Sequence, residues 1–395
     1  TAPFITSTMQ RAASSKLGFG VSKTMQVAQK LYEGIEIDGT PVGLITYMRT
    51  DSVRVSDDAQ NMAHDFILQN YGEKYYPEKA NIYAKGKQNV QDAHEAIRPS
   101  YPERTPDSIK KYLDNDQYKL YKLIWEKFMS SQMSPAEIAN KTIEISSGDY
   151  TLRAGTSKIT FDGFLTLYND SEDDEEKASD AKIPDLEKGD KVVCKKILPK
   201  QHFTQPPPRY NEASLVKALE EYGIGRPSTY ATIITVIQTR KYVEKKDKAL
   251  RPTLLGRTVS KQLVSQFSDI MDYKFTAGME EKLDKIAEKQ AVWVKVLQDF
   301  YTPFMEEVNS VMKTAQKVNI ETNIKCPNCG KPMLLRTSKT GSQFLGCSGY
   351  PDCKTAMSIN VMQEMENSED GTIPTQQQEV CEEKCEKCGS DMIFK

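Results

Sequence analysis

Seven of the eight cysteines lie after residue 325, in closely spaced groups that are typical of metal ligands. Cys326 and Cys329 are followed by Cys347 and Cys353, so four thiols come in two close pairs. Zn²⁺ takes four such ligands in a tetrahedron. The spacing therefore predicts a zinc ribbon over residues 323–362 that folds largely through zinc binding, with free thiols as the alternative.

The last cysteines predict a second finger that this sequence does not complete. After a linker over residues 363–380, Cys385 and Cys388 have the spacing of a first knuckle within residues 381–395, and Cys381 offers one more thiol. A fourth ligand does not follow. We therefore expect a weak, incomplete zinc site here, and we expect the natural protein to continue beyond both ends of this sequence.

Length and charge limit what the remainder can be. The 395 residues exceed what one compact core usually holds, so we expect roughly two to four units. An apolar run of about eighteen residues is absent, as is a signal peptide, so we expect a cytoplasmic protein without a membrane span. The net charge is only −2, yet residues 205–262 carry eleven Lys and Arg against five Asp and Glu. This segment predicts a surface for phosphate groups, with a solvated helix face as the alternative.

Apolar periodicity predicts a multidomain α+β protein. Helical patterns are present in four segments, at 7–17, 22–32, 57–70 and 107–133. A β-branched, apolar run predicts a buried strand over 41–49, and short alternating runs such as 191–194 predict a β-rich part over 139–198. Residues 209–312 are helical again, with a hairpin at 242–254. The predicted domains before the ribbon are 1–136, 137–204 and 205–322.

One candidate site lies at the end of the strand predicted over 41–49. Side chains alternate along a strand, so Tyr47, Arg49 and Asp51 would project from one face. A tyrosine hydroxyl is a poor nucleophile at neutral pH, and a guanidinium beside it can hold a phosphodiester and stabilise developing charge. The alternative is a surface tyrosine next to an ion pair.

A second candidate site lies around His94 and Arg98. If the segment is helical, these two side chains share one face at i and i+4, and Pro99 ends the helix. A histidine and an arginine that converge on a phosphodiester could position it or move protons. A capped helix end with a satisfied histidine is the alternative.

Five strings resemble type IA DNA topoisomerases, in the same order along the chain. They lie at residues 3–10, 17–20, 45–52, 94–99 and 221–231. Each is several residues long, and together they spread over the first 320 residues or so. The resemblance implies an arch made of a helical catalytic domain, a β-rich gate segment and a helical DNA-binding domain, followed by the zinc ribbon.

The resemblance also implies roles for single residues. Tyr47 would be the nucleophile that forms a 5′-phosphotyrosyl link, Arg49 would bind the scissile phosphate, and Asp51 and His94 would support the nucleophile. The expected contacts to single-stranded DNA are Arg49, Arg98, Arg226, Thr229 and Arg240. The implied activity is ATP-independent relaxation of negatively supercoiled DNA by a nucleoid-associated monomer.

One feature of the family is missing from the sequence. Type IA enzymes carry an N-terminal Toprim domain whose carboxylates bind Mg²⁺ and complete the active site. Such a segment does not precede Thr1. We therefore expect Zn²⁺ in the ribbon, Mg²⁺ in the complete enzyme, and poor cleavage by this chain without a Toprim domain.

Two other classes of protein compete with this interpretation. A non-catalytic DNA-binding protein could combine a winged helix with a zinc ribbon, but it would not need the Tyr47 motif or a covalent product. A tyrosine recombinase also forms phosphotyrosyl bonds, yet it attaches the 3′ end and keeps its tyrosine near the C-terminus. The position of Tyr47 near the start of the sequence favours the topoisomerase.

Overall fold

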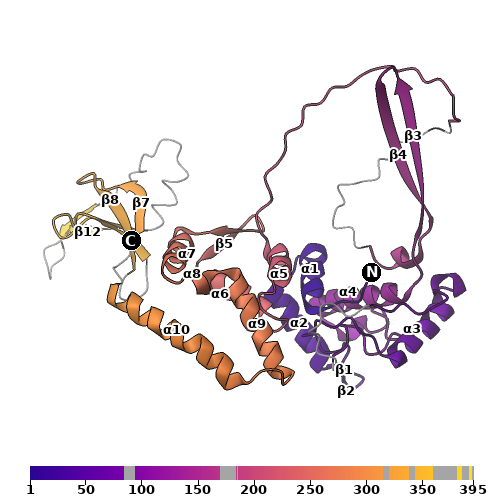
Figure 1. Ribbon diagram of the computed structural model, residues 1–395, viewed down its shortest axis with the longest axis horizontal. Helices are drawn as coiled ribbons and strands as arrows, with labels where there is room; N and C mark the ends of the chain where they lie inside the picture. Colours follow the sequence, from indigo (N-terminus) through magenta and orange to yellow (C-terminus); the bar gives the residue numbers. More distant parts are fainter. Residues whose placement is uncertain are drawn as a thin grey trace. The chain divides into compact units, whose positions relative to one another are not determined.

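The computed structural model describes residues 1–83, 94–169, 184, 186–314, 320–337, 343–358, 380–384 and 391–393. The chain divides into one unit over Thr1–Phe304 and another over Met305–Lys395. The first unit contains helices and β-hairpins, and the second contains mainly strands, as predicted for an α+β protein (Figure 1). Among the described residues, a helix long and apolar enough to span a membrane is absent.

The first unit begins with two helices at the predicted positions. Helix α1 spans Thr6–Leu17 and ends at Gly18, whose φ of 67° is the left-handed conformation that glycine adopts easily. Helix α2 spans Val21–Glu33. Both contribute apolar side chains to the main core, where Met9, Ala28 and Leu31 are fully buried.

The buried strand predicted over 41–49 is not formed. A short antiparallel hairpin of β1 (Ile35–Ile37) and β2 (Thr40–Val42) ends at the start of this segment. Beyond it the backbone is irregular and has one isolated bridge, between Ile45 and Pro99. The prediction is wrong because an apolar, β-branched run does not show whether a neighbouring strand exists to pair with it.

Two further helices complete the core of this region. Helix α3 spans Asp57–Asn70, as predicted, and Ser56 caps its first turn. Helix α4 spans Asn115–Gln132 and starts later than the predicted residue 107, because Asp114 and Gln117 form a capping box. The preceding turns include the 3₁₀ helix η2 (Lys110–Tyr112), and η1 (Glu73–Tyr75) follows α3.

The β-rich part is one long antiparallel hairpin. Strand β3 (Glu137–Ser147) pairs with β4 (Tyr150–Phe161), and the two extend away from the helices of their unit (Figure 1). The 3₁₀ helix η3 (Gly163–Thr166) follows. The prediction of a strand at 191–194 is wrong. The described residues 186–211 contain no strand, and the side chains of residues 191–194 are exposed.

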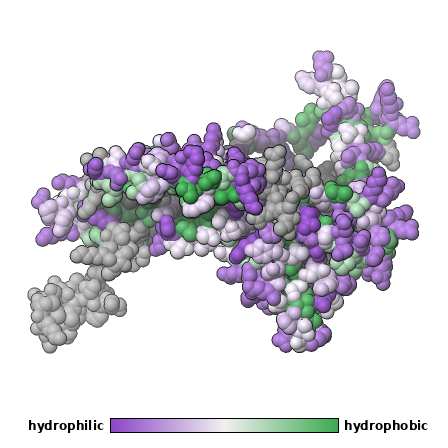
Figure 2. All heavy atoms as spheres, turned by 60° about the horizontal axis from the view of Figure 1, so that its bottom comes forward, coloured by the Kyte–Doolittle hydropathy of each residue, from purple (hydrophilic) through white to green (hydrophobic). Residues whose placement is uncertain are grey.

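The helical part of the first unit matches the prediction, including its hairpin. It contains α5 (Glu212–Glu221), α6 (Tyr230–Thr239), β5 (Val243–Lys246), β6 (Ala249–Pro252), α7 (Leu254–Gln266), α8 (Ser268–Met271), α9 (Tyr273–Ala287) and α10 (Trp293–Thr314). Helix α10 continues into the second unit. On the face drawn in Figure 2, hydrophilic side chains cover most of the described surface, as expected for a chain with 27% charged residues.

A buried carboxylate joins α2, α5 and the β5–β6 hairpin. Glu212 accepts a hydrogen bond from the Val21 backbone N–H at 2.8 Å and one from Lys245 Nζ at 2.9 Å. Burial by itself would raise the pKa of Glu212, but the hydrogen bonds from Lys245 and Val21 hold that pKa below its ordinary value. The ionised carboxylate therefore stabilises the contact between these elements.

Replacing Glu212 by glutamine is expected to lower the free energy of unfolding at pH 7 by about 1.5–3 kcal/mol, the range for hydrogen bonds to a charged group. Because the pKa is lower in the folded state, this stabilisation is present above the unfolded pKa of about 4.3 and is lost as the pH falls through the folded pKa. Chemical unfolding of the wild type and of the Glu212→Gln variant, each at pH 7 and below pH ~4, measures the difference in unfolding free energy. Glu221→Gln, an exposed change on the same helix, should alter stability by less than about 0.5 kcal/mol. Equal stability of the Glu212→Gln variant and the wild type at pH 7 would contradict this role.

The second unit contains the ribbon. Four antiparallel strands form one sheet in the order β10-β9-β8-β7. They are β7 (Ile320–Lys325), β8 (Pro332–Thr337), β9 (Gln343–Cys347) and β10 (Ala356–Ser358), and a separate hairpin follows from β11 (Val380–Lys384) and β12 (Asp391–Ile393). The buried core of the ribbon is small and includes Ile324, Met333 and Leu345 beside two cysteines. A core of this size rarely holds a fold of this length without a metal.

Candidate functional site

The loop that carries Tyr47 is fixed on one side by Thr6. The fully buried Thr6 hydroxyl lies 2.8 Å from the carbonyl oxygen of Met48 and 2.9 Å from that of Thr50. It also accepts the Thr50 backbone N–H at 2.9 Å. Because Thr6 belongs to the first turn of α1, the backbone on both sides of Arg49 is anchored to a helix in the core.

The other side of the loop is fixed by the segment after residue 94. Thr46 donates its backbone N–H to the carbonyl of Arg98 at 3.0 Å and its hydroxyl to the carbonyl of Ala96 at 2.7 Å. The Arg98 N–H in turn donates to the Thr46 hydroxyl at 3.0 Å. Two threonines therefore hold the backbone of residues 46–50 between the start of α1 and the 96–98 segment.

The Tyr47 ring contacts two other rings and is only partly buried. Its centroid is 5.3 Å from that of Tyr32, edge to face, and 5.5 Å from that of His94, in a tilted arrangement. The Tyr47 hydroxyl has no hydrogen-bond partner among the residues that the structure describes. The hydroxyl is therefore available to a ligand, while the ring is held by its neighbours.

Arg49 and Asp51 do not share one strand face with Tyr47, because the strand is absent. Burial nevertheless alternates along the loop, since Met48 and Thr50 are buried and Arg49 is exposed. Arg49 forms no ion pair with any described residue. Asp51 lines a cleft beside α1 and α6, and no hydrogen bond joins it to Tyr47 within the described part of the chain.

The segment around His94 is extended, so the predicted helical pairing of His94 and Arg98 is wrong. Ile97 forms an isolated bridge with Phe4, which excludes a helix here. His94 faces the Tyr47 ring, whereas Arg98 turns to other partners. Each of the three side-chain nitrogens of Arg98 is engaged: Nε and Nη2 with Glu95 at 2.8 and 2.6 Å, and Nη1 with the carbonyl of Pro99 at 3.0 Å.

Arg226 lines the same cleft as Asp51, which has a volume of about 1100 Å³. Its guanidinium is 2.5 Å from Asp284 and 3.9 Å from Glu280, both on α9. Burial alone would lower the pKa of Arg226, but the hydrogen bond and charge of Asp284 raise it. Nearby, burial raises the pKa of Tyr230 to about 12. Arg226 is therefore a permanent cation that carboxylates hold in place.

The other two expected DNA contacts lie at the ends of α6. Thr229 precedes the helix, and its hydroxyl accepts the backbone N–H of Arg226 at 2.8 Å. Arg240 follows the last turn and is exposed, without an ion pair to any residue that the structure describes. The structure thus places Arg226 and Thr229 together and Arg240 at the opposite end of the helix.

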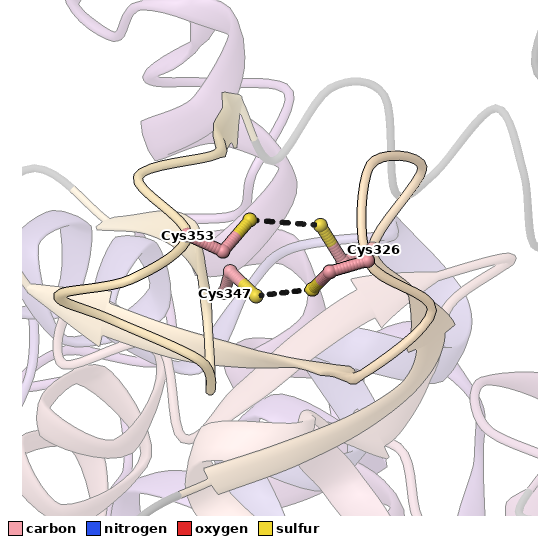
Figure 3. A group of neighbouring side chains, drawn as sticks. Cys326, Cys347 and Cys353 are labelled. Carbon is pink, nitrogen blue, oxygen red and sulfur yellow. Dashed lines mark hydrogen bonds between the residues drawn. The ribbon is translucent and has the colours of Figure 1, made fainter.

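The zinc site is formed as the cysteine spacing predicts. The Sγ atoms of Cys326, Cys329, Cys347 and Cys353 all lie within 4.8 Å of one another. Two of the separations are 3.6 Å, for Cys326 and Cys353, and 3.3 Å, for Cys329 and Cys347 (Figure 3). Four thiolates about 2.3 Å from one Zn²⁺ would be about 3.8 Å apart, so the cluster fits a tetrahedral ion.

The surroundings favour the thiolate form of two cysteines, Cys326 and Cys353. The Gly349 N–H by itself would lower the pKa of Cys347, but burial and the neighbouring thiols raise that pKa to about 12. Hydrogen bonds from the side chain and backbone of Thr355 lower the pKa of Cys353, and the Gly349 N–H donates to Cys347 Sγ at 3.3 Å. Zinc binds the deprotonated thiol, so such contacts support binding. Cys385 and Cys388, the predicted start of a second site, lie outside the described residues.

Sequence reasoning missed the residues that hold the site together. Thr6 and Thr46 fix the Tyr47 loop, Tyr32 packs against its ring, and Glu95 binds Arg98. Three of them could have been found from the sequence, because Thr6, Thr46 and Glu95 lie inside the strings that resemble type IA topoisomerases. Tyr32 carried no signal, since its contact with Tyr47 depends on how α2 turns into the following loop.

Comparisons with known proteins match both parts of the chain that contain these sites. The family model described as DNA topoisomerase matches residues 1–298, and the one described as topoisomerase DNA binding C4 zinc finger matches residues 323–361 and 382–395. Among solved structures, full-length topoisomerase I from Thermotoga maritima matches with a TM-score of 0.69 and 36% sequence identity. That match covers 90% of this chain and 57% of the other, so the chain spans somewhat more than half the length of that relative.

Proposed function

The chain belongs to the type IA family of DNA topoisomerases, and from this premise we propose that it provides the cleaving tyrosine of an ATP-independent enzyme that relaxes negatively supercoiled DNA. The proposed reaction is transient cleavage of one strand, passage of DNA through the break and religation. The observation that carries the proposal is the Tyr47 hydroxyl, which has no partner among the described residues while its loop is anchored on both sides.

In the proposed cleavage step, the Tyr47 oxygen attacks a backbone phosphorus. A bond forms between Tyr47 Oη and phosphorus as the bond from phosphorus to the 3′ oxygen breaks. The tyrosine proton leaves, the 3′ oxygen gains a proton, and the phosphate remains on the 5′ end. His94, beside the Tyr47 ring, is placed to take part in these proton movements, and the exposed Arg49 is free to bind the phosphate.

The covalent link preserves the energy of the phosphodiester bond. Religation is the reverse attack by the 3′ hydroxyl, so the cycle needs no nucleotide cofactor. We propose that Asp51, Arg226, Thr229 and Arg240 also line the surface along which the DNA strand binds. Arg98 contributes to this surface indirectly, because it supports the Tyr47 loop. The ribbon, with Zn²⁺ held by its four cysteines, adds a second DNA-binding surface.

Magnesium is proposed as the second metal of the complete enzyme. Its ligands would be the Toprim carboxylates that the family uses, and no residue described here is assigned to it. The ion would supply charge neutralisation at the phosphate when bound. The residues of this chain would still bind the strand and provide the nucleophile.

Label transfer from single-stranded DNA tests the proposed function. The chain is incubated with Mg²⁺ and an oligonucleotide labelled at its 3′ or its 5′ end, with and without a separately prepared Toprim domain, and then denatured. We expect label on the protein only from the 3′-labelled strand, and mainly when the Toprim domain is present. Label from the 5′-labelled strand would contradict the proposed polarity, and DNA binding without label in any reaction would favour a non-catalytic binding protein.

A further inference from the structure

Glu95 lies between two arginines, one residue after the histidine that contacts the Tyr47 ring. Its Oε2 atom is 2.6 Å from Arg98 Nη2, and its Oε1 atom is 3.8 Å from Arg54 Nη2. Glu95 directly follows His94, whose ring contacts that of Tyr47. The carboxylate and both guanidiniums therefore belong to segments whose backbone is joined to the Tyr47 loop or follows it closely in the sequence.

The two arginines differ in what they can still bind. The Arg98 side chain is 12% exposed, and all three of its nitrogens already have protein partners. The Arg54 side chain is 45% exposed, and its ion pair to Glu95, the one it forms with a described residue, is long at 3.8 Å. An exposed pair at this distance is weak and yields readily to a competing anion.

The backbone of Arg54 is nevertheless well fixed. Its carbonyl accepts the Ala96 N–H at 2.8 Å, and its N–H donates to the Ser52 hydroxyl at 3.2 Å. Ser52 is buried and lies two residues after the Tyr47 loop. An exposed cation on a fixed backbone is a suitable phosphate ligand, because little conformational freedom is lost when it binds.

We propose that Arg54 is a further DNA-binding residue of this site, one that contacts a backbone phosphate of the strand on which Tyr47 acts. Glu95 orients it in the absence of DNA, and Arg98 keeps Glu95 in place. Arg98 is then a positioning residue that acts through Glu95. This inference rests on the proposed function, because it requires single-stranded DNA to lie along the Tyr47 loop.

The test is the salt dependence of binding to a fluorescent single-stranded oligonucleotide, measured with the full chain. Each phosphate contact that is lost should reduce the slope of log K against log salt by about 0.7. We expect Arg54→Gln to weaken binding several-fold at low salt and to lower the slope by about one contact, while Arg54→Lys, which keeps the charge, retains most of the wild-type slope. Arg98→Gln should lower the unfolding temperature more than the slope.

Arg153→Gln is the matched control. Arg153 is also an exposed arginine paired with a carboxylate, Glu144, but it lies on the β3–β4 hairpin. We expect its slope and affinity to equal those of the wild type. If the Arg54→Gln variant kept the wild-type slope, the proposed role of Arg54 would be wrong while the proposed function could stand. If the wild-type chain showed no salt-dependent binding, the proposed function would be wrong as well.

Discussion

Replacing Tyr47 by phenylalanine is expected to abolish covalent attachment of DNA while leaving the fold and DNA binding intact. The phenyl ring can keep the packing against Tyr32 and His94, and only the hydroxyl is lost. Since that hydroxyl has no partner among the described residues, stability should change by less than about 0.5 kcal/mol. The measurement is the fraction of 3′-labelled oligonucleotide retained on denatured protein in the presence of the Toprim domain and Mg²⁺.

Tyr32→Phe is the control for this experiment. The Tyr32 ring lies 5.3 Å from that of Tyr47, and the side chain is 40% exposed, so it is the nearest alternative tyrosine in the described part of the chain. We expect this variant to retain label at the wild-type level. Label on the Tyr47→Phe protein, or loss of label from the Tyr32→Phe protein alone, would show that the nucleophile was assigned to the wrong tyrosine.

Removal of zinc is expected to unfold the ribbon. Its buried core is small, and apparent zinc-binding energies of about 10–16 kcal/mol at pH 7 are typical of structural sites of this kind, so folding and binding should be one event. Either a strong chelator or Cys326→Ser should release one zinc ion per chain and expose residues 320–358 to limited proteolysis. The unfolding temperature of the first unit should not change.

Cys194→Ser provides the matched control, because Cys194 is exposed and distant in sequence from the four-cysteine cluster. It should leave both zinc content and protease resistance at wild-type levels. A Cys326→Ser protein that keeps its full zinc content would contradict the assignment of this ligand. A metal-free ribbon that resists proteolysis would contradict the role of zinc in folding.

The elements that local chemistry determines could be predicted from the sequence. The boundaries of α3 and the end of α1 at Gly18 follow from caps and apolar periodicity. The ribbon follows from cysteine spacing, because four metal ligands restrict a short chain more than any propensity does. The β5–β6 hairpin lies within the hairpin predicted at 242–254.

What failed depended on partners distant in the sequence. The loop at Tyr47 has the composition of a buried strand, yet its hydrogen bonds go to Thr6 and to residues 96–98, roughly forty to fifty positions away. Residues 191–194 alternate like a strand but have no neighbour to pair with in the described structure. Local patterns specify which face of a segment is apolar, but they do not show which other segment lies against it.

The structure brings together only part of the predicted candidate site. Tyr47 and His94 are in contact, although by ring packing and not through two regular elements. Asp51 lies instead in the cleft with Arg226. The Arg98 guanidinium forms an ion pair with Glu95 and a hydrogen bond to the carbonyl of Pro99. A sequence reports which side chains are present, whereas the competition among neighbouring carboxylates for each arginine appears only in three dimensions.

Identification of the DNA-linked residue by mass spectrometry tests the central proposal most directly. Cleavage after Lys30 and Arg49 gives one peptide, residues 31–49, that contains both Tyr32 and Tyr47, so fragment ions must separate the two. After reaction with Mg²⁺, Toprim domain and DNA, followed by nuclease digestion, we expect a 5′-nucleotide phosphate on Tyr47. The same adduct on Tyr32, or on a peptide elsewhere in the chain, would contradict Tyr47 as the nucleophile.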